Sequence, residues 1–209
     1  MNRLFGWFGL PGTVVLTSLM SLTALVMALV FPTPDRWLRF AAMLLGSLGD
    51  LILMHDPRVS AKLPPFLRSF IAGGLVFFLS HLVYAAAFTV RSRLAGVPAF
   101  TGWFWAGPAL AAGLFLSLAV LQRKSKKRDP AQLVLFGLYF LSICSVFGLA
   151  LVYAAETGGA AWGTVAGSAS FIFSDYLIAL NNLTDYALPD NDVWVWWFYP
   201  LGQLGLLLF

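Results

Sequence analysis

Two aspartates lie inside long apolar runs of the sequence, Asp50 at the end of GSLGD and Asp175 within SASFIFSDYLIALNN. A carboxylate inside a membrane-spanning helix is energetically costly, so it usually faces a cavity and has a function. Two buried carboxyl groups that lie close together differ in proton affinity, so that one can act as an acid and the other as a base. We therefore predict that Asp50 and Asp175 converge and do acid–base chemistry.

Other polar residues follow helical spacing around these aspartates. Residues at i and i+3 or i+4 share one face of a helix, and four such stripes occur in the sequence. The stripes are Gly46, Ser47, Asp50 and Met54; Phe77, His81, Tyr84 and Phe88; Ser168, Phe171, Asp175, Ile178 and Asn182; and Tyr199 with Gln203. Four helices that each carry polar atoms on one side are expected to surround a small polar chamber.

These side chains also have structural interpretations. Asp50 can be a hydrogen-bond partner of Ser47 one turn away, or of a neighbouring helix. His81 is explained at least as well as a histidine that is satisfied within the bundle. Tyr199 and Gln203 are more often helix–helix contacts than ligand contacts. Both interpretations stay open at the level of the sequence.

The elements that must position these residues are seven apolar runs, each close to the roughly 20 residues that a helix needs to cross a bilayer. The runs lie at 11–30, 36–54, 69–90, 103–121, 132–154, 157–183 and 193–209. They are too long for membrane strands and show no period-two alternation. With 60% hydrophobic and 11% charged residues among 209, a soluble domain could not hide the apolar surface. The sequence predicts an all-α, polytopic transmembrane bundle of about seven spans that forms a single domain over residues 1–209.

Basic residues between the runs predict the orientation of this bundle. The densest cluster, RKSKKR at 123–128, is expected on the cytoplasmic side together with the N-terminus. That side then holds nine Lys and Arg residues: Arg3, Arg58, Lys62, Arg68, Arg123, Lys124, Lys126, Lys127 and Arg128. The opposite side holds four: Arg36, Arg39, Arg91 and Arg93. Because the net charge of +4 is scattered over short loops, nucleic acid is not an expected partner.

With this orientation, both aspartates belong to the cytoplasmic half of the bundle. At about 1.5 Å per residue, Asp50 lies about 6 Å from the end of its run and Asp175 about 12 Å from the end of its own. Asn182 lies near the membrane interface, where it can cap its span as readily as it can line a site. The similar depth of the two aspartates supports their convergence.

Three segments and the last run carry patterned residues in a fixed order. The residues are Gly46, Ser47, Gly49 and Asp50; Gly74, Phe78, His81 and Tyr84; Gly167, Phe171, Ser174 and Asp175; and Tyr199 with Gln203. Together they resemble the YhhN-type lysoplasmalogenase family of integral membrane proteins. The likeness extends over nearly the whole chain from about residue 11.

The resemblance implies hydrolysis of the vinyl ether bond of a lysoplasmalogen to a fatty aldehyde and a glycerophospho-ethanolamine or -choline. The short, compact chain is expected in the cytoplasmic (inner) membrane of a bacterium. This chemistry suits catalysis by Asp50 and Asp175 without a cofactor. The sequence does not say which of them is the acid, and the greater depth of Asp175 makes it the candidate. The residues expected to bind the lysophospholipid are Ser47, His81, Tyr84, Ser174, Asn182, Tyr199 and Gln203. Arg58, Lys62 or Arg68 would draw its phosphate to the rim.

Other classes of protein use similar residues. A proton-coupled transporter of small molecules could use the same aspartates, although the sequence has no evident inverted repeat or pair of broken helices. A zinc hydrolase is disfavoured because the only histidines are His55 and His81, so that Asp50 and Asp175 would both have to be ligands. No metal site is therefore predicted. A structural scaffold would leave the similar depth of the two aspartates unexplained.

Overall fold

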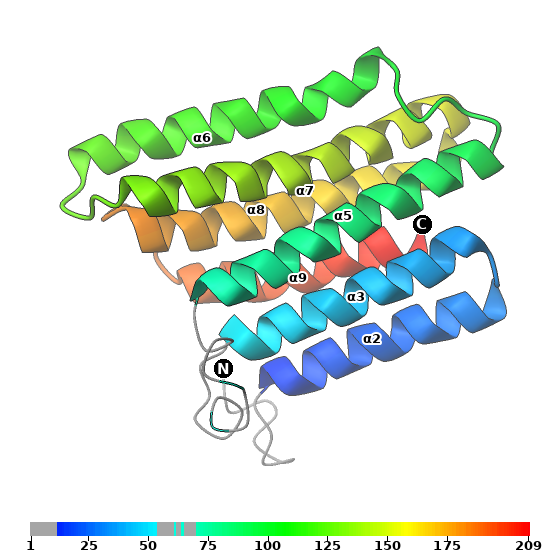
Figure 1. Ribbon diagram of the computed structural model, residues 1–209, viewed down its shortest axis with the longest axis horizontal. Coiled ribbons are helices and arrows are strands. Elements are labelled where there is room, and N and C mark those ends of the chain that lie inside the picture. Colours follow the sequence, from blue (N-terminus) through cyan, green and yellow to red (C-terminus); the bar gives the residue numbers. More distant parts are fainter. Residues whose placement is uncertain (1–11, 54–60, 62–63, 65–69) are drawn as a thin grey trace. The chain divides into compact units, whose positions relative to one another are not determined.

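The computed structural model describes residues 12–53, 61, 64 and 70–209, and in these ranges it has seven α-helices and no strand. Figure 1 shows the helices α2 (Gly12–Val30), α3 (Pro34–Leu53), α5 (Phe70–Leu94), α6 (Ala106–Lys124), α7 (Pro130–Thr157), α8 (Trp162–Leu183) and α9 (Asn191–Leu208). Short 3-10 helices, η3 (Gly102–Trp105) and η4 (Gly159–Ala161), precede α6 and α8. The all-α class predicted from the composition is confirmed.

Five helical stretches of the described ranges are apolar and long enough to cross a membrane, namely α2, α5, α6 with η3, α7, and α8 with η4. The other two helices are more polar or shorter. Helix α3 carries Asp35, Arg36, Arg39 and Asp50 among its 20 residues, and α9 has 18 residues interrupted by Pro200. The chain is therefore an integral membrane protein by helix length and composition, while seven spans and a cytoplasmic N-terminus stay predictions.

Helix boundaries differ from the expected runs where the backbone has a local reason. Thr157 was expected to open the sixth run but is the last residue of α7, because Gly158 and Gly159 adopt φ angles of 68° and 56° that end the helix. Helix α5 continues to Leu94, beyond the expected end at 90. The fourth run is expected to begin at Trp103, but Gly102–Trp105 form the 3-10 helix η3 and α6 begins at Ala106. The edges of three expected runs, Pro11, Met54 and Ser69, lie outside the described residues.

The chain divides into two compact units, residues 1–87 and 88–209, which we describe separately. The boundary falls within α5, so that most of this helix belongs to the first unit and its last turns belong to the second. The expectation of a single domain stays a prediction.

In the first unit, polar side chains join α3 to both of its neighbours. The Ser47 hydroxyl lies 2.7 Å from that of Ser21 on α2 and donates to the Thr17 carbonyl at 3.2 Å. On the other side, the Ser80 hydroxyl of α5 donates to the Ala42 carbonyl of α3 at 2.7 Å. Hydroxyl groups that bond to a neighbouring backbone are a common means of joining helices in lipid.

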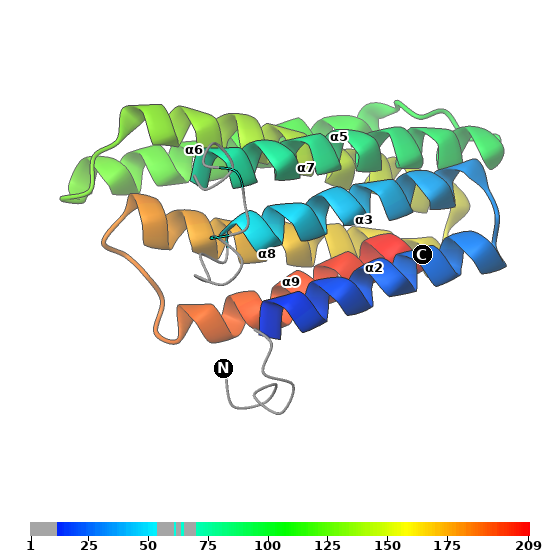
Figure 2. The same cartoon turned by 60° about the horizontal axis from the view of Figure 1, so that its bottom comes forward.

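In the second unit, glycines let the backbones of α8 and α9 touch. Figures 1 and 2 show these helices as an antiparallel pair joined by residues 184–190. A Cβ atom on Gly167 would lie 2.6 Å from the Cα of Gly205, and one on Gly202 would lie 2.7 Å from the Cβ of Phe171. Only residues without a side chain permit this approach, which is how small residues pack helices in membranes.

Helices α6 and α7 also pack side by side in this unit, as Figure 2 shows. A Cβ atom on Gly107 of α6 would overlap the carbonyl oxygen of Cys144 on α7. Helix α7 begins at a defined cap, since the Asp129 carboxylate accepts from the Gln132 amide at 2.9 Å and Pro130 follows it directly. The start of α7 is thus fixed beside the end of α6.

Candidate functional site

The carboxyl group of Asp175 lies in the interior of the second unit and is held by neighbouring hydroxyl groups. Its side chain is on α8 and the residue is only 6% exposed. The Tyr139 hydroxyl of α7 donates to Oδ2 at 2.5 Å. The Ser174 hydroxyl lies 3.4 Å from Oδ1 and bonds more closely to the Phe171 carbonyl, at 2.8 Å. A buried carboxyl group with a designated partner on another helix is typical of a functional polar site.

Tyr139 and Asp175 meet because α7 and α8 are antiparallel and joined by only a short connection. Tyr139 lies nine residues after Pro130 at the start of α7, and Asp175 lies eight residues before Leu183 at the end of α8. At about 1.5 Å per residue, each is about 12 to 14 Å from the same end of the unit. The geometry of the helix pair alone therefore brings the two residues to one level.

The neighbouring tyrosine on α8 has a separate partner. The Tyr176 hydroxyl lies 2.8 Å from that of Ser117 on α6. Its ring packs against the ring of Phe140 with centroids 6.2 Å apart. Two successive residues of α8, Asp175 and Tyr176, thus bond to two different helices.

The basic loop at 123–128 is bound to the end of α8 that lies nearest to Asp175. The Asp185 carboxylate accepts from the Lys126 amide at 2.7 Å and from the Ser125 hydroxyl at 2.8 Å. The Lys127 ammonium donates to the Asn181 carbonyl at 2.8 Å. The amide of Lys126, followed by the hydroxyl of Ser125, lowers the pKa of the Asp185 carboxyl below its ordinary value. Asp175 is therefore closer to the end of α8 that contacts the basic loop than to the opposite end of this helix.

Asp50, the second aspartate predicted from the sequence, belongs to the first unit. It lies three residues before the end of α3 and is half-buried. The Ser47 hydroxyl bonds to Ser21 and to the Thr17 carbonyl of α2 rather than to Asp50. Because Asp50 and Asp175 are in different units, their convergence stays a prediction.

His81 and Tyr84 lie on α5 in the first unit and are both buried. The His81 ring packs beside that of Phe77 with centroids 6.5 Å apart, and the Tyr84 hydroxyl lies 3.9 Å from the sulfur of Met43 on α3. In the first unit, Tyr84 of the predicted stripe therefore contacts α3. Roles in binding substrate stay predictions for both residues.

The other predicted binding residues lie on α8 and α9. The Gln203 amide donates to the Tyr199 hydroxyl at 3.3 Å, and both residues are buried. The Tyr199 ring packs on the ring of Phe171 with centroids 5.2 Å apart, so this pair joins α9 to α8. Asn182 is exposed, and its amide donates to the Ile178 carbonyl of its own helix at 2.8 Å. The predicted phosphate contacts, Arg58, Lys62 and Arg68, lie outside the described residues.

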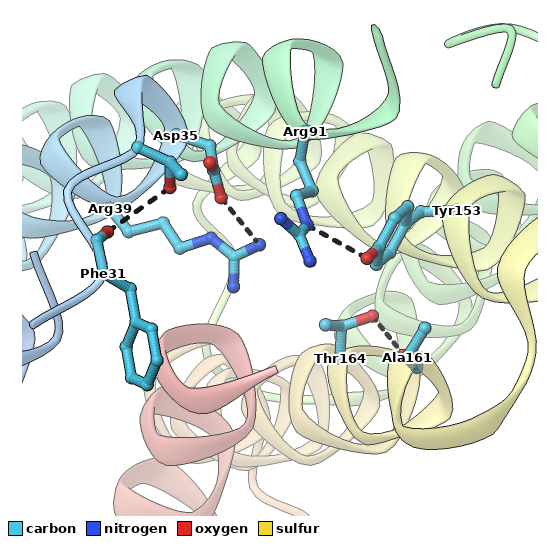
Figure 3. Close-up of polar contacts among 8 residues, drawn as sticks. Phe31, Asp35, Arg39, Arg91, Tyr153, Ala161 and Thr164 are labelled. Atoms are coloured by element: carbon cyan, nitrogen blue, oxygen red, sulfur yellow. Dashed lines mark hydrogen bonds and ion pairs between the residues drawn. The ribbon is translucent and has the colours of Figure 1, made fainter. Parts of the chain in front are cut away.

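Two contacts of arginine side chains were not predicted from the sequence, and Figure 3 shows each of them. In the first unit, Arg39 and Asp35 form an ion pair of 3.5 Å with both side chains buried. In the second unit, the Arg91 guanidinium donates from Nε to the Tyr153 hydroxyl at 3.0 Å and lies over its ring, 5.5 Å from the centroid. The sequence patterns assign these arginines only to topology. For Arg39, which is buried, the requirement of a buried charge for a partner is a signal that could indicate the pair with Asp35.

Tyr139 is the other residue that sequence reasoning missed. A tyrosine hydroxyl inside a long apolar helix needs a hydrogen-bond partner, which is a usable signal. The sequence does not give the identity of that partner. In the described ranges, no group of three His, Cys, Asp or Glu side chains is arranged to hold a metal ion.

A comparison with known protein families gives a match, which extends over nearly the whole chain. The sequence model of the YhhN family matches residues 13–208, which include α3, α5, α7 and α8 with both aspartates and Tyr139. No curated protein and no solved structure matches the chain significantly.

Proposed function

The chain belongs to the YhhN family, and from this premise we propose that it hydrolyses the vinyl ether bond of a lysoplasmalogen. Family membership supports a membrane hydrolase of the lysoplasmalogenase type. The finer proposal is that a lysophospholipid with an alkenyl chain is the substrate, and that a fatty aldehyde and a glycerophospho-base are the products. The enzyme would act in a bacterial cytoplasmic membrane.

The reaction divides naturally between an acid and a base. A proton is transferred to the alkene carbon, which leaves an oxocarbenium ion at the carbon bonded to oxygen. Water adds to this cation and loses a proton, and the resulting hemiacetal collapses to an aldehyde and an alcohol. Glycosidases use a pair of carboxyl groups for a related cation, and positioned acids and bases accelerate such steps by about 10²- to 10⁴-fold.

The observation that carries the proposal is the carboxyl group of Asp175, buried in a membrane protein and held by Tyr139 at 2.5 Å. A carboxyl group is costly in this environment, which favours a function for it beyond joining α7 to α8. We assign it the role of the acid. Asp50, which is half-buried and close to the end of α3, is assigned to water activation and to stabilising the cation.

The remaining roles follow from the positions of the polar side chains. His81 and Tyr84 of α5 are proposed to orient water or the headgroup together with Ser47. Ser174, Asn182, Tyr199 and Gln203 of α8 and α9 complete the proposed substrate site. The apolar faces of the same helices would hold the alkenyl chain.

The test measures aldehyde release from a lysoplasmenyl-choline by the purified protein in detergent micelles. Asp50→Asn and Asp175→Asn keep the size of each side chain but remove its acid–base function, so each should reduce kcat by at least about 100-fold. The matched control is Asp192→Asn, which changes an aspartate in the first turn of α9 and should leave kcat unchanged. All three variants should elute as folded protein in size-exclusion chromatography.

Two results would contradict the proposal. Full activity of either Asp50→Asn or Asp175→Asn would remove the two-carboxylate mechanism. A wild-type protein that releases no aldehyde, but moves protons in liposomes when a small molecule is added, would instead favour the transporter.

A further inference from the structure

Tyr139 is the one described side chain from another helix that bonds to the carboxyl group of Asp175, at 2.5 Å. We propose that Tyr139 is a positioning residue, which holds Oδ2 of Asp175 so that Oδ1 faces the alkene carbon of the substrate. The inference rests on the proposed function and adds a residue to its machinery. It assigns a role to α7, which the sequence patterns did not connect with the site.

The geometry gives the two oxygens of Asp175 different environments. Oδ2 accepts a short hydrogen bond from a phenol on α7. Among the described residues, the hydrogen-bond partner of Oδ1 is the Ser174 hydroxyl, at 3.4 Å, and that hydroxyl bonds more closely to its own helix at Phe171. A carboxyl group anchored at one oxygen cannot rotate freely, so the other oxygen keeps a fixed direction.

The reaction supplies a second reason for this contact. When the proton passes from Oδ1 to the alkene carbon, the O–H bond breaks, a C–H bond forms and negative charge develops on the carboxyl group of Asp175. Oδ2 carries part of that charge, and the Tyr139 hydroxyl already donates to it. A donor aimed at a site of developing charge stabilises the transition state more than the ground state. Removing it should therefore lower kcat more than it changes KM.

The chain provides a matched control next to the site. Tyr176 is a half-buried tyrosine on α8, adjacent in sequence to Asp175, but its hydroxyl lies 2.8 Å from Ser117. Tyr139→Phe and Tyr176→Phe each remove one phenolic oxygen from the same packed group of helices. Only the first variant removes a hydrogen bond to Asp175.

The kinetic experiment compares these variants with the wild type on lysoplasmenyl-choline in detergent micelles. Tyr139→Phe should lower kcat about 10- to 100-fold with KM within about 2-fold, a smaller loss than that of a catalytic group. Tyr176→Phe should keep kcat within about 2-fold. Equal effects of the two variants, or an unchanged kcat in Tyr139→Phe, would overturn the positioning role.

An infrared experiment tests the contact between Tyr139 and Asp175 without measuring activity. The infrared band of the Asp175 carboxyl group is identified as the band lost in Asp175→Asn. In Tyr139→Phe this band should move, because one oxygen loses its donor, and in Tyr176→Phe it should stay in place. The reciprocal measurement, a shift of tyrosine bands in Asp175→Asn, covers the case in which Tyr139→Phe does not fold. Bands that stay fixed in these variants would overturn the contact itself.

The two experiments separate the failure of this inference from that of the proposed function. An inactive Asp175→Asn with a fully active Tyr139→Phe would remove only the role of Tyr139. A wild-type protein without aldehyde release would remove the proposed reaction and, with it, the positioning role, while the infrared bands would still report whether Tyr139 holds Asp175.

Discussion

Three tyrosine hydroxyls of the second unit each have a partner on another helix. Tyr139 bonds to Asp175 at 2.5 Å, Tyr176 to Ser117 at 2.8 Å, and Tyr153 to Arg91 at 3.0 Å. A hydroxyl group inside an apolar environment is costly without a hydrogen bond, so these contacts select one register for the helices that carry them. At the scale of single residues, these three tyrosine hydrogen bonds therefore help to determine how α5, α6, α7 and α8 pair in this unit.

The contact between Tyr153 and Arg91 gives a prediction for stability. Tyr153→Phe keeps the ring beneath the guanidinium but removes the hydroxyl that accepts from Nε at 3.0 Å. A hydrogen bond to a charged group contributes about 1.5 to 3 kcal/mol, and Arg91 is partly exposed, so a loss of about 1 kcal/mol is expected. The measurement is denaturant unfolding in detergent micelles. A Tyr153→Phe variant as stable as the wild type would show that solvent or lipid replaces the bond.

The part of the site that the sequence could predict is the part set by residue type alone. Asp175 stands out because a carboxyl group is rare in an apolar run, and its depth follows from counting residues to Leu183. Tyr139 does not stand out in the same way, since its role depends on which face of α7 meets α8. The orientation of α7 also depends on its packing against other segments, such as Gly107 of α6 against the backbone at Cys144, and no local pattern encodes it.

At the scale of elements, the positions of the helices were predictable and their ends were less so. In the described ranges each of the seven apolar runs contains a helix, because length and hydrophobicity are strong signals for helices of this kind. The ends depend on single residues. Gly158 at φ 68° ends α7 after Thr157, whereas hydropathy alone does not separate Thr157 from the following run.

The contact between the basic loop and the end of α8 gives a prediction at this scale. The pKa of the Asp185 carboxyl is lowered by the Lys126 amide and the Ser125 hydroxyl. A lowered pKa in the folded protein means that the contact is fully present above the ordinary aspartate pKa of about 3.9 and is lost as the pH falls below it. Amide hydrogen exchange at 125–127 should therefore lose protection below pH about 4, after correction for intrinsic rates.

A variant separates this contact from general acid unfolding. Asp185→Ala should remove the protection at 125–127 already at neutral pH, while exchange in the middle of α7 stays slow. The control is Asp190→Ala, in the same connection between α8 and α9. Protection that persists in Asp185→Ala would mean that the loop is held by the Lys127 contact with Asn181 alone.

At the scale of the whole molecule, the distribution of basic residues predicts the orientation in the membrane. The chain has a single cysteine, Cys144, which is buried, so new cysteines can be labelled over a low background. Lys126→Cys should react with a membrane-impermeant maleimide only after cells are permeabilised, and Ala95→Cys should react in intact cells. Both positions are exposed. The reverse pattern would invert the orientation and place Asp175 nearer to the outer face.

A lipid that reaches Asp175 sideways from the bilayer needs a gap between two helices through which its tail can slide. Between α8 and α9 there is none over the first half of α8, because Gly167 and Gly205 meet backbone to backbone. Farther along, the Ser170 hydroxyl bonds to the Phe198 carbonyl at 3.1 Å and the rings of Phe173 and Phe198 lie 4.8 Å apart. This seam is closed to a hydrocarbon chain. A lateral entry path for the lipid tail would then lie on another side of α8. Helices α8 and α9 would move as one rigid pair while that path opens.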